Sequence, residues 1–109
     1  MHCVADDGRA VVHVTGELDV VSAAPLRREL VRLAEADVGH VLVDLTEVTF
    51  IDSTGMGVLI GALKRFRSAG GCLELVVRDA RVLRVLRIAG LSRTFTIHAT
   101  VGEALAADA

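Results

Sequence analysis

The most apolar part of the sequence, residues 49–59, is interrupted by four small residues: Asp52, Ser53, Thr54 and Gly55. A carboxylate beside two hydroxyls allows three kinds of chemistry: helix capping, nucleophilic catalysis, or the acceptance of a phosphate. Capping accounts for one of these side chains, because Asp, Ser and Thr oxygens accept the unpaired amides of a first helical turn. It does not account for Gly55 and Gly57, each of which costs a helix about 0.5–1 kcal/mol relative to alanine. Glycines at these positions would leave backbone amides open to an anion.

Nucleophilic catalysis by Ser53 lacks its usual partners in the sequence. A hydrolase nucleophile elbow requires glycine two residues before the serine, where this chain has Ile51. A general base is also required, and the spacing of the histidines directs none of them at Ser53. Structural roles are expected for all four: His2, His13, His40 and His98. A phosphate-binding loop of the form G-x-x-x-x-G-K-[ST] is absent from the sequence. We therefore expect no enzymatic activity, no cofactor and no metal site.

Phosphorylation of Ser53 is the third possibility. A phosphate adds about −1.5 to −2 charges, and at a helix N-terminus these charges meet the positive end of the helix dipole. The modification is therefore not expected to unfold the domain. A partner that covers the hydroxyl would have to desolvate a dianion beside Asp52, and a loss of ~3 kcal/mol would weaken binding about a hundredfold. The sequence thus favours an interface switch without a change of fold.

The composition is that of a globular chain, since 52% of the 109 residues are hydrophobic and 24% are charged. A net charge of −2 without a basic stripe argues against nucleic acid as a partner. Cys3 and Cys72 have no CxxC spacing, which favours free thiols in a reducing compartment. No apolar run reaches the roughly 18–20 residues of a membrane span, and the first residues show no signal-peptide pattern. We expect one cytoplasmic domain over residues 1–109.

Strands and helices are predicted to alternate along the chain. Strands are predicted over 10–16, 40–45, 72–77 and 94–98, with a short edge strand before residue 10 that an Asp-Asp-Gly turn closes. Helices are predicted over 22–36, 54–71, 81–90 and 101–107. Their expected N-caps are Ser22, Asp79 and Thr100, and a glycine pair, Gly70 and Gly71, ends the second helix. This order specifies an α/β domain, a mixed and mostly parallel sheet of four to five strands packed with about four helices.

Two loops come directly after strands of this predicted sheet. Residues 16–19 come after the first long strand, and residues 46–52 connect the second to its helix. In open sheets of this class, function tends to lie beyond the carboxyl ends of the strands. If the two strands are neighbours, Asp19 and Asp52 flank the same patch of surface.

Two motifs, T-G-E-L-D at 15–19 and F-I-D-S-T-G-M-G at 50–57, resemble the signatures of the STAS domain of bacterial anti-sigma factor antagonists, and the resemblance extends over about residues 10–107. It implies that the unmodified chain binds an anti-sigma factor, itself a serine kinase of the GHKL ATPase type, and so frees a sigma factor. It further implies that the kinase phosphorylates Ser53, which breaks the partnership, and that a metal-dependent serine phosphatase restores it.

The resemblance also implies roles for the neighbours of the acceptor. Asp19 and Asp52 help to form the acceptor site, and Thr54 and Gly55 shape it from the first turn of the helix. Thr54 ranks well below Ser53 as a second acceptor.

A partner surface is expected to continue along the helix after Ser53. Met56, Gly57 and Ile60 lie at the edge of its apolar arc and either complete the core or form a contact ridge. Phe50 is interpreted as a packing anchor of the loop, and Leu18 as an anchor or a contact. A row of arginines is interpreted as a solvated face: Arg81, Arg84 and Arg87.

Two other functions stay open on the sequence alone. A STAS domain could bind a nucleotide or another small ligand at this helix N-terminus, or it could serve as a scaffold module that regulates another partner. Titration with nucleotides distinguishes the first of these, because a binding module responds without a kinase. A monomer is expected, since no apolar edge is evident.

Overall fold

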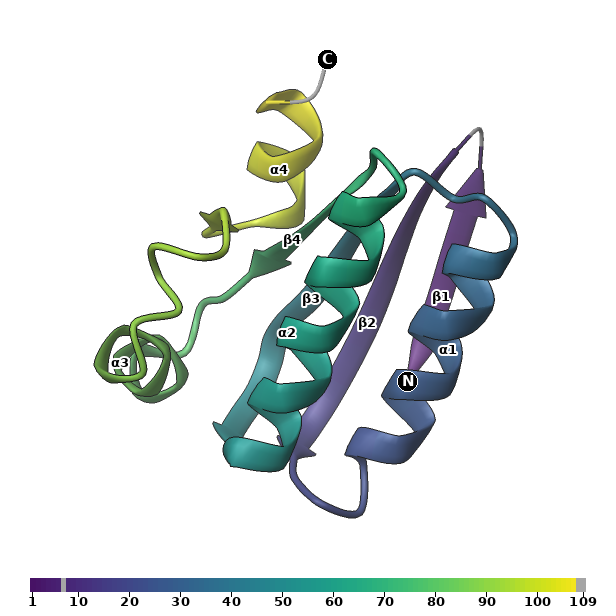
Figure 1. The fold of residues 1–109 in the computed structure, drawn as a ribbon. Helices are drawn as coiled ribbons and strands as arrows, with labels where there is room; N and C mark the ends of the chain where they lie inside the picture. Colours follow the sequence, from purple (N-terminus) through teal and green to yellow (C-terminus); the bar gives the residue numbers. More distant parts are fainter. Residues whose placement is uncertain (7, 108–109) are drawn as a thin grey trace.

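Within residues 1–6 and 8–107, which the computed structural model describes, five strands form one sheet and four helices accompany it (Figure 1). The strands are β1 (His2–Asp6), β2 (Arg9–Leu18), β3 (His40–Ile51), β4 (Cys72–Val76) and β5 (Ile97–His98). The helices are α1 (Ala23–Glu35), α2 (Ser53–Ser68), α3 (Ala80–Ile88) and α4 (Val101–Ala107).

The sheet has the strand order β1-β2-β3-β4-β5. The β1–β2 pair is antiparallel, whereas β2, β3, β4 and β5 run parallel to one another. A helix lies in each connection between parallel strands, and α1 and α2 lie side by side over one face of the sheet (Figure 1). The predicted α/β class with a mixed, mostly parallel sheet is confirmed.

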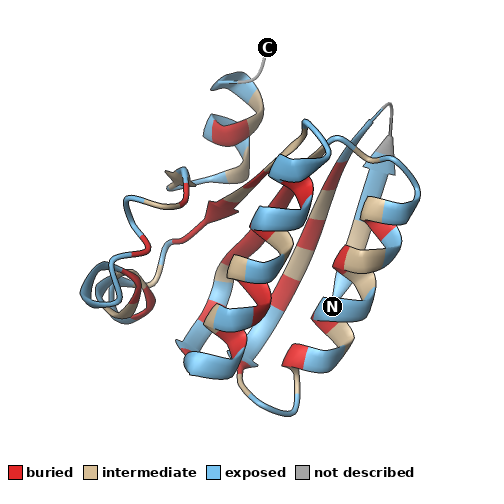
Figure 2. Ribbon diagram, in the orientation of Figure 1, coloured by how far each residue is buried: buried red, intermediate tan, exposed pale blue. Residues whose placement is uncertain are grey.

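One main core fills the space between the sheet and the helices on this face. Figure 2 shows buried residues concentrated on the strands and on the sides of α1 and α2 that face them. Along each helix the buried residues recur at three- or four-residue spacing, which turns one apolar stripe toward the strands. Its helical members include Leu26, Leu30, Leu33, Leu59, Leu63 and Phe66.

The opposite face of the sheet carries a smaller cluster, in which Ala104 of α4 packs with Leu42 of β3 and Val76 of β4. Because α4 covers this face, every residue from Val41 to Leu45 is buried. The expectation that the strand at 40–45 is central and covered on both faces is therefore confirmed.

The prediction that residues 46–52 form a connection is wrong, because β3 continues to Ile51. β2 is also longer than predicted and ends at Leu18, so that residues 16–18 are strand rather than loop. The two extensions pair with each other up to Leu18 opposite Ile51, with register shifts around residues 13–17, whereas β4 pairs only with residues 40–44 of β3. The sequence hides this ladder because the two strands that form it are distant in the chain.

Other element boundaries moved by smaller amounts. The strand predicted over 94–98 is only Ile97–His98, because the amide of Phe95 bonds the carbonyl of Leu91 in a turn and its ring is buried. The helix predicted over 54–71 ends at Ser68, two residues before Gly70, which has a φ of 81°.

Two of the predicted helix caps form as expected. Asp79 accepts the amides of Arg81 and Val82, and Thr100 accepts that of Glu103, so both of these predictions are confirmed. The predicted Asp-Asp-Gly turn includes residue 7, which lies outside the described residues. Among the described helices, none is long and apolar enough to span a membrane.

Candidate functional site

The paired ends of β2 and β3 bring the two predicted loops together. Leu18 and Ile51 are register partners, and the amide of Asp52 donates to the carbonyl of Leu18 at 3.2 Å. Asp19 and Asp52 are therefore the first residues beyond two neighbouring strand ends, at the bottom edge of the sheet in Figure 1. The expectation that they flank one patch of surface is confirmed.

Asp52 is the N-cap of α2. Its backbone is extended (φ −109°, ψ −177°), and its Oδ1 accepts the amide of Gly55 at 2.9 Å. The amide of Met56 donates to the Asp52 carbonyl at 3.0 Å, which starts the helical ladder. Of the three candidate side chains, Asp52 is thus the cap, and the hydroxyls of Ser53 and Thr54 are not needed for that purpose.

Ser53 and Thr54 are the first two residues of α2, and both are exposed. The positive end of the α2 dipole therefore lies under Ser53, and a negative charge on its hydroxyl would be stabilised there. Asp52 has already turned its carboxylate inward to the helix amide. The arrangement leaves Ser53 exposed beside a fixed carboxylate.

Asp19 fixes the tight turn between β2 and α1. Its Oδ1 accepts the amides of Val21 at 3.0 Å and Ser22 at 3.1 Å. The hydrogen bond from Ser22, together with that from Val21, lowers the pKa of the Asp19 carboxyl below its ordinary value despite some desolvation. The carboxylate therefore stays ionised at neutral pH, beside the acceptor surface.

The role predicted for Ser22 is wrong. Ser22 stands at the N-cap position of α1 but makes no side-chain capping bond. Its hydroxyl instead donates to the carbonyl of Glu17 at 2.7 Å and accepts the amide of Asp19 at 2.9 Å. The hydroxyl is therefore engaged with the turn before the helix and not with the amides of its first turn.

The two glycines of the motif have different environments. A Cβ at Gly55 would lie 2.7 Å from Leu18 Cγ, 2.8 Å from the Leu18 carbonyl oxygen and 3.3 Å from Ile51 Cγ1. Gly55 is buried and its amide is bonded to Asp52, so the expectation of an open backbone amide there is wrong. Gly57 is exposed, and a Cβ there would meet nothing within 4 Å. Gly55 is required for close packing of α2 on β2, whereas the fold does not require Gly57.

The predicted contact residues divide in a similar way. Leu18 is fully buried, so it is an anchor and its candidacy as a surface contact is wrong. Met56 and Ile60 are half-buried and pack against the core, leaving part of each side chain on the surface. Gly57 lies on the exposed side beside them.

The exposure of three apolar residues near Asp19 and Asp52 was not predicted from the sequence. Phe50 is 48% exposed, which overturns its interpretation as a packing anchor, and Val20 and Val21 are 68% and 80% exposed. Phe50 precedes Asp52 by two residues, and the valines come directly after Asp19. A signal was present in the sequence, since two consecutive valines in a turn between strand and helix have no core to enter.

The histidines are engaged within the sheet. His13 Nδ1 lies 2.6 Å from Asp44 Oδ2, and the Nε2 atoms of His40 and His98 lie 3.0 and 3.4 Å from Glu74 Oε1. These pairs join neighbouring strands, in keeping with the expected structural roles. Among the described residues, no group of three or more His, Cys, Asp or Glu side chains could hold a metal ion.

Comparison with known proteins identifies the family of the chain. The family model for the STAS domain matches residues 3–104. This chain is a STAS domain. The anti-sigma-B factor antagonist of Bacillus subtilis is 40% identical to it over 88 residues, which cover 81% of this chain and 80% of the relative. The STAS domain therefore belongs with the anti-sigma factor antagonists.

Solved structures agree with that assignment. An anti-sigma factor antagonist from Mycobacterium paratuberculosis superposes on the STAS domain with a TM-score of 0.87 and 28% identity, covering 97% of this chain and 90% of that one. The unphosphorylated form of the anti-sigma factor antagonist SpoIIAA has a TM-score of 0.83 at 22% identity, covering 95% of this chain and 91% of that one. At that identity, the second likeness concerns the fold alone.

Proposed function

We propose that this STAS domain is an anti-sigma factor antagonist that works by partner switching. In its unphosphorylated form it binds an anti-sigma factor that is also a serine kinase of the GHKL type, and thereby frees a sigma factor. The kinase transfers a phosphoryl group to the Ser53 hydroxyl, which ends the interaction, and a metal-dependent serine phosphatase restores it. The nucleotide and the metal belong to those enzymes, and the chain acts as a monomeric cytoplasmic switch.

The observation that carries the proposal is the exposed Ser53 hydroxyl at the start of α2, with Asp52 turned away to cap the helix. A phosphate at this position is compatible with the folded state, because the helix dipole favours negative charge there. It adds about −1.5 to −2 charges to a patch that already holds the ionised Asp19 carboxylate. A partner that desolvates this patch therefore loses affinity although the fold is unchanged.

Exposed apolar side chains beside the acceptor supply the binding surface in this proposal. Val20 and Val21 lie in the turn after β2, Phe50 lies near the end of β3, and the exposed parts of Met56 and Ile60 continue the surface along α2. A few well-packed apolar or aromatic side chains usually dominate the affinity of an interface, and these exposed residues are the candidates for that role in the proposal. In this proposal Thr54 and Gly55, in the first turn of α2, shape the backbone around Ser53.

The test is the intact mass of the purified chain after incubation with ATP and lysate of its native host. One phosphoryl increment is expected on the wild-type chain and on Thr54→Ala, and none on Ser53→Ala. The kinase is then purified by its ability to phosphorylate Ser53. The proposal is overturned if the wild-type chain gains no phosphate, or if Ser53→Ala gains as much as the wild type. Binding of a nucleotide by the chain without any kinase would instead favour a ligand-binding domain.

A further inference from the structure

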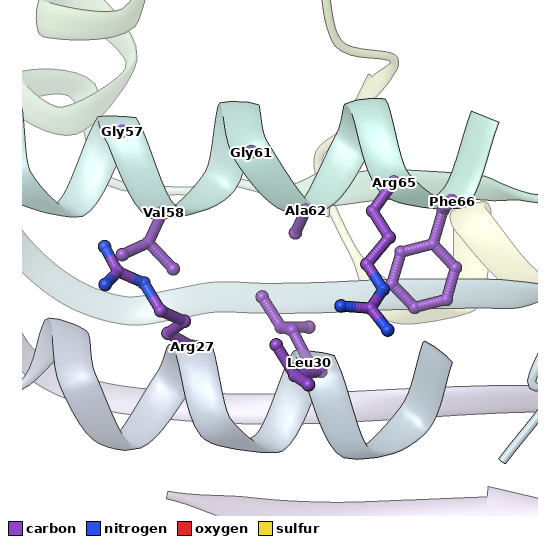
Figure 3. Close-up of a pocket in the computed structure, with 9 residues that line it drawn as sticks. Arg27, Leu30, Gly57, Val58, Gly61, Ala62, Arg65 and Phe66 are labelled. Carbon is purple, nitrogen blue, oxygen red and sulfur yellow. The ribbon is translucent and has the colours of Figure 1, made fainter. Parts of the chain in front are cut away.

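A groove between α1 and α2 shares only Gly57 with the partner surface expected beside Ser53. It has a volume of about 240 Å³ and runs along the facing sides of the two helices (Figure 3). Its floor is formed by the core residues Leu30, Val58 and Phe66, which are only 2–4% exposed, and the half-buried Val31 of α1 also lines it. The volume lies below the roughly 300–1,000 Å³ of ordinary small-molecule sites, so the groove suits inserted side chains better than a whole ligand.

On the α2 side the groove is lined by residues with little or no side chain, Gly57, Gly61 and Ala62. A Cβ at Gly57 or at Gly61 would meet nothing within 4 Å, so the fold does not require either glycine. Each lowers the stability of the helix relative to alanine. Packing within the chain gives these glycines no role, and their missing side chains leave room for another molecule to approach the helix closely.

The charge of the groove indicates what that molecule carries. Arg27 of α1 and Arg65 of α2 stand at its two ends, and the described residues that line it include no carboxylate (Figure 3). Arg65 lies 3.9 Å from Glu35, a contact between strongly exposed side chains that binds weakly in water. Both arginines are exposed and can pair with acidic groups of an incoming segment.

The position of the groove connects it with the acceptor. Gly57 is four residues after Ser53, so the groove opens one helical turn from the phosphorylation site. From Gly57 to Arg65 the helix rises about 12 Å, or roughly two turns. A helix of similar length would span the groove with an apolar side chain at its centre and carboxylates toward both ends.

We propose that this groove docks an amphipathic, acidic helix of the kinase that phosphorylates Ser53. The inference rests on the proposed function, and it adds a second contact that phosphorylation does not touch. Docking holds the kinase in register with the acceptor, while the Ser53 surface decides whether the complex persists.

The experiment uses the full chain and the kinase purified by its activity on Ser53. Gly61→Leu fills the groove, Gly61→Ala places one methyl group in it, and Lys64→Leu is a control of equal bulk on the exposed side of α2. For Gly61→Leu the dissociation constant and the KM for Ser53 phosphorylation are expected to rise at least ~10-fold, with kcat unchanged. Gly61→Ala gives a smaller rise in the same direction while its melting temperature increases, and Lys64→Leu binds as the wild type does.

A double charge reversal, Arg27→Glu with Arg65→Glu, tests the acidic character of the partner. It is expected to weaken binding and to flatten its dependence on salt concentration. The docking inference is overturned if Gly61→Leu, folded by circular dichroism, binds the kinase within about twofold of the wild type while Ser53 is still phosphorylated. It is also overturned if Gly61→Leu abolishes self-association of the chain or nucleotide binding instead. Absence of any kinase acting on Ser53 overturns the proposed function and this inference with it.

Discussion

Two turns of this molecule lead from a strand into a helix through an aspartate cap, and they differ in the residues around that cap. Asp52 accepts the amide of Gly55 at the start of α2, and Asp79 accepts the amides of Arg81 and Val82 at the start of α3. The carboxylate of Asp79 is also bonded by the guanidinium of Arg81, at 3.0 Å from its Oδ2.

The difference shows that an aspartate-capped helix N-terminus is not in itself a candidate phosphorylation site. At α3 the residue after the cap is Ala80, and the charge of the cap is neutralised by its own neighbour. At α2 an exposed hydroxyl comes after the cap, and a second ionised carboxylate, Asp19, stands on the adjacent strand end. In the proposed switch, acceptor chemistry at α2 depends on the residue after the cap and on the neighbouring turn.

The largest expected effect is on binding at the α2 turn. Ser53→Asp places a permanent charge beside Asp19 and Asp52 and is expected to raise the dissociation constant of the kinase complex about a hundredfold, equivalent to ~3 kcal/mol. Calorimetric titration measures it. In the control Ser53→Asn, the new side chain has nearly the same size as that of aspartate but carries no charge. This variant is expected to bind within about tenfold of the wild type. Equal losses for both variants would show that size, not charge, controls the interface.

The second effect concerns stability. Gly55→Ala forces a Cβ to within 2.8 Å of the Leu18 carbonyl oxygen, and a cost of about 1–3 kcal/mol in the free energy of unfolding is expected. Gly57→Ala is the matched control, since it meets nothing and is expected to stabilise the helix by about 0.5–1 kcal/mol. Urea denaturation of the two variants distinguishes them. The same sign for both would contradict the distinct roles assigned to these glycines.

The third effect is the loss of the α2 cap. Asp52→Ala removes the acceptor for the Gly55 amide and is expected to lower the free energy of unfolding by about 0.5–2 kcal/mol. Thermal unfolding measures it, with Asp52→Asn as a variant that retains an oxygen and recovers most of the loss. No loss in Asp52→Ala would mean that the amide finds another acceptor.

A smaller, pH-dependent effect is expected at the α3 cap. The pKa of Asp79 is lowered from 3.8 to about 2. The largest cause is the hydrogen bond from the guanidinium of Arg81, and the backbone amides of Val82 and Arg81 add to it. Since the folded-state pKa lies below the unfolded one, the contribution to stability is complete above pH 3.8 and is lost as the pH falls toward about 2. The melting-temperature difference between the wild type and Asp79→Asn should shrink over that window. A constant difference would show that the ionised carboxylate is not the stabilising group.

The last prediction expects no effect. In a Ser53→Ala background, Ala80→Ser recreates an Asp-Ser pair at a helix start, now beside Arg81 and without a neighbouring Asp19 turn. The kinase is expected to leave this serine unmodified, as read by intact mass. A phosphoryl increment would show that a capped Asp-Ser dipeptide suffices for recognition, and the comparison between the two turns would fail.

Much of the fold could be predicted from local pattern. The helical spacing of Leu26, Leu30 and Leu33 predicted α1, and the short apolar run at 40–45 predicted a buried central strand. Two of three predicted side-chain caps, Asp79 and Thr100, also formed, because a cap involves groups within three residues of one another. Ser22 did not, since its hydroxyl is engaged by the Glu17 carbonyl and the Asp19 amide in the turn before the helix.

The sequence by itself determined the α/β order and the position of Ser53 at a helix start, since both depend on residues close in the chain. Only the tertiary structure decided the roles of Gly55 and Gly57, identical residues two positions apart in one helix. Leu18, from another strand, packs against the first and leaves the second open. The exposure of Phe50 was decided in the same way, because the β2–β3 extension that carries it forms only when distant segments pair.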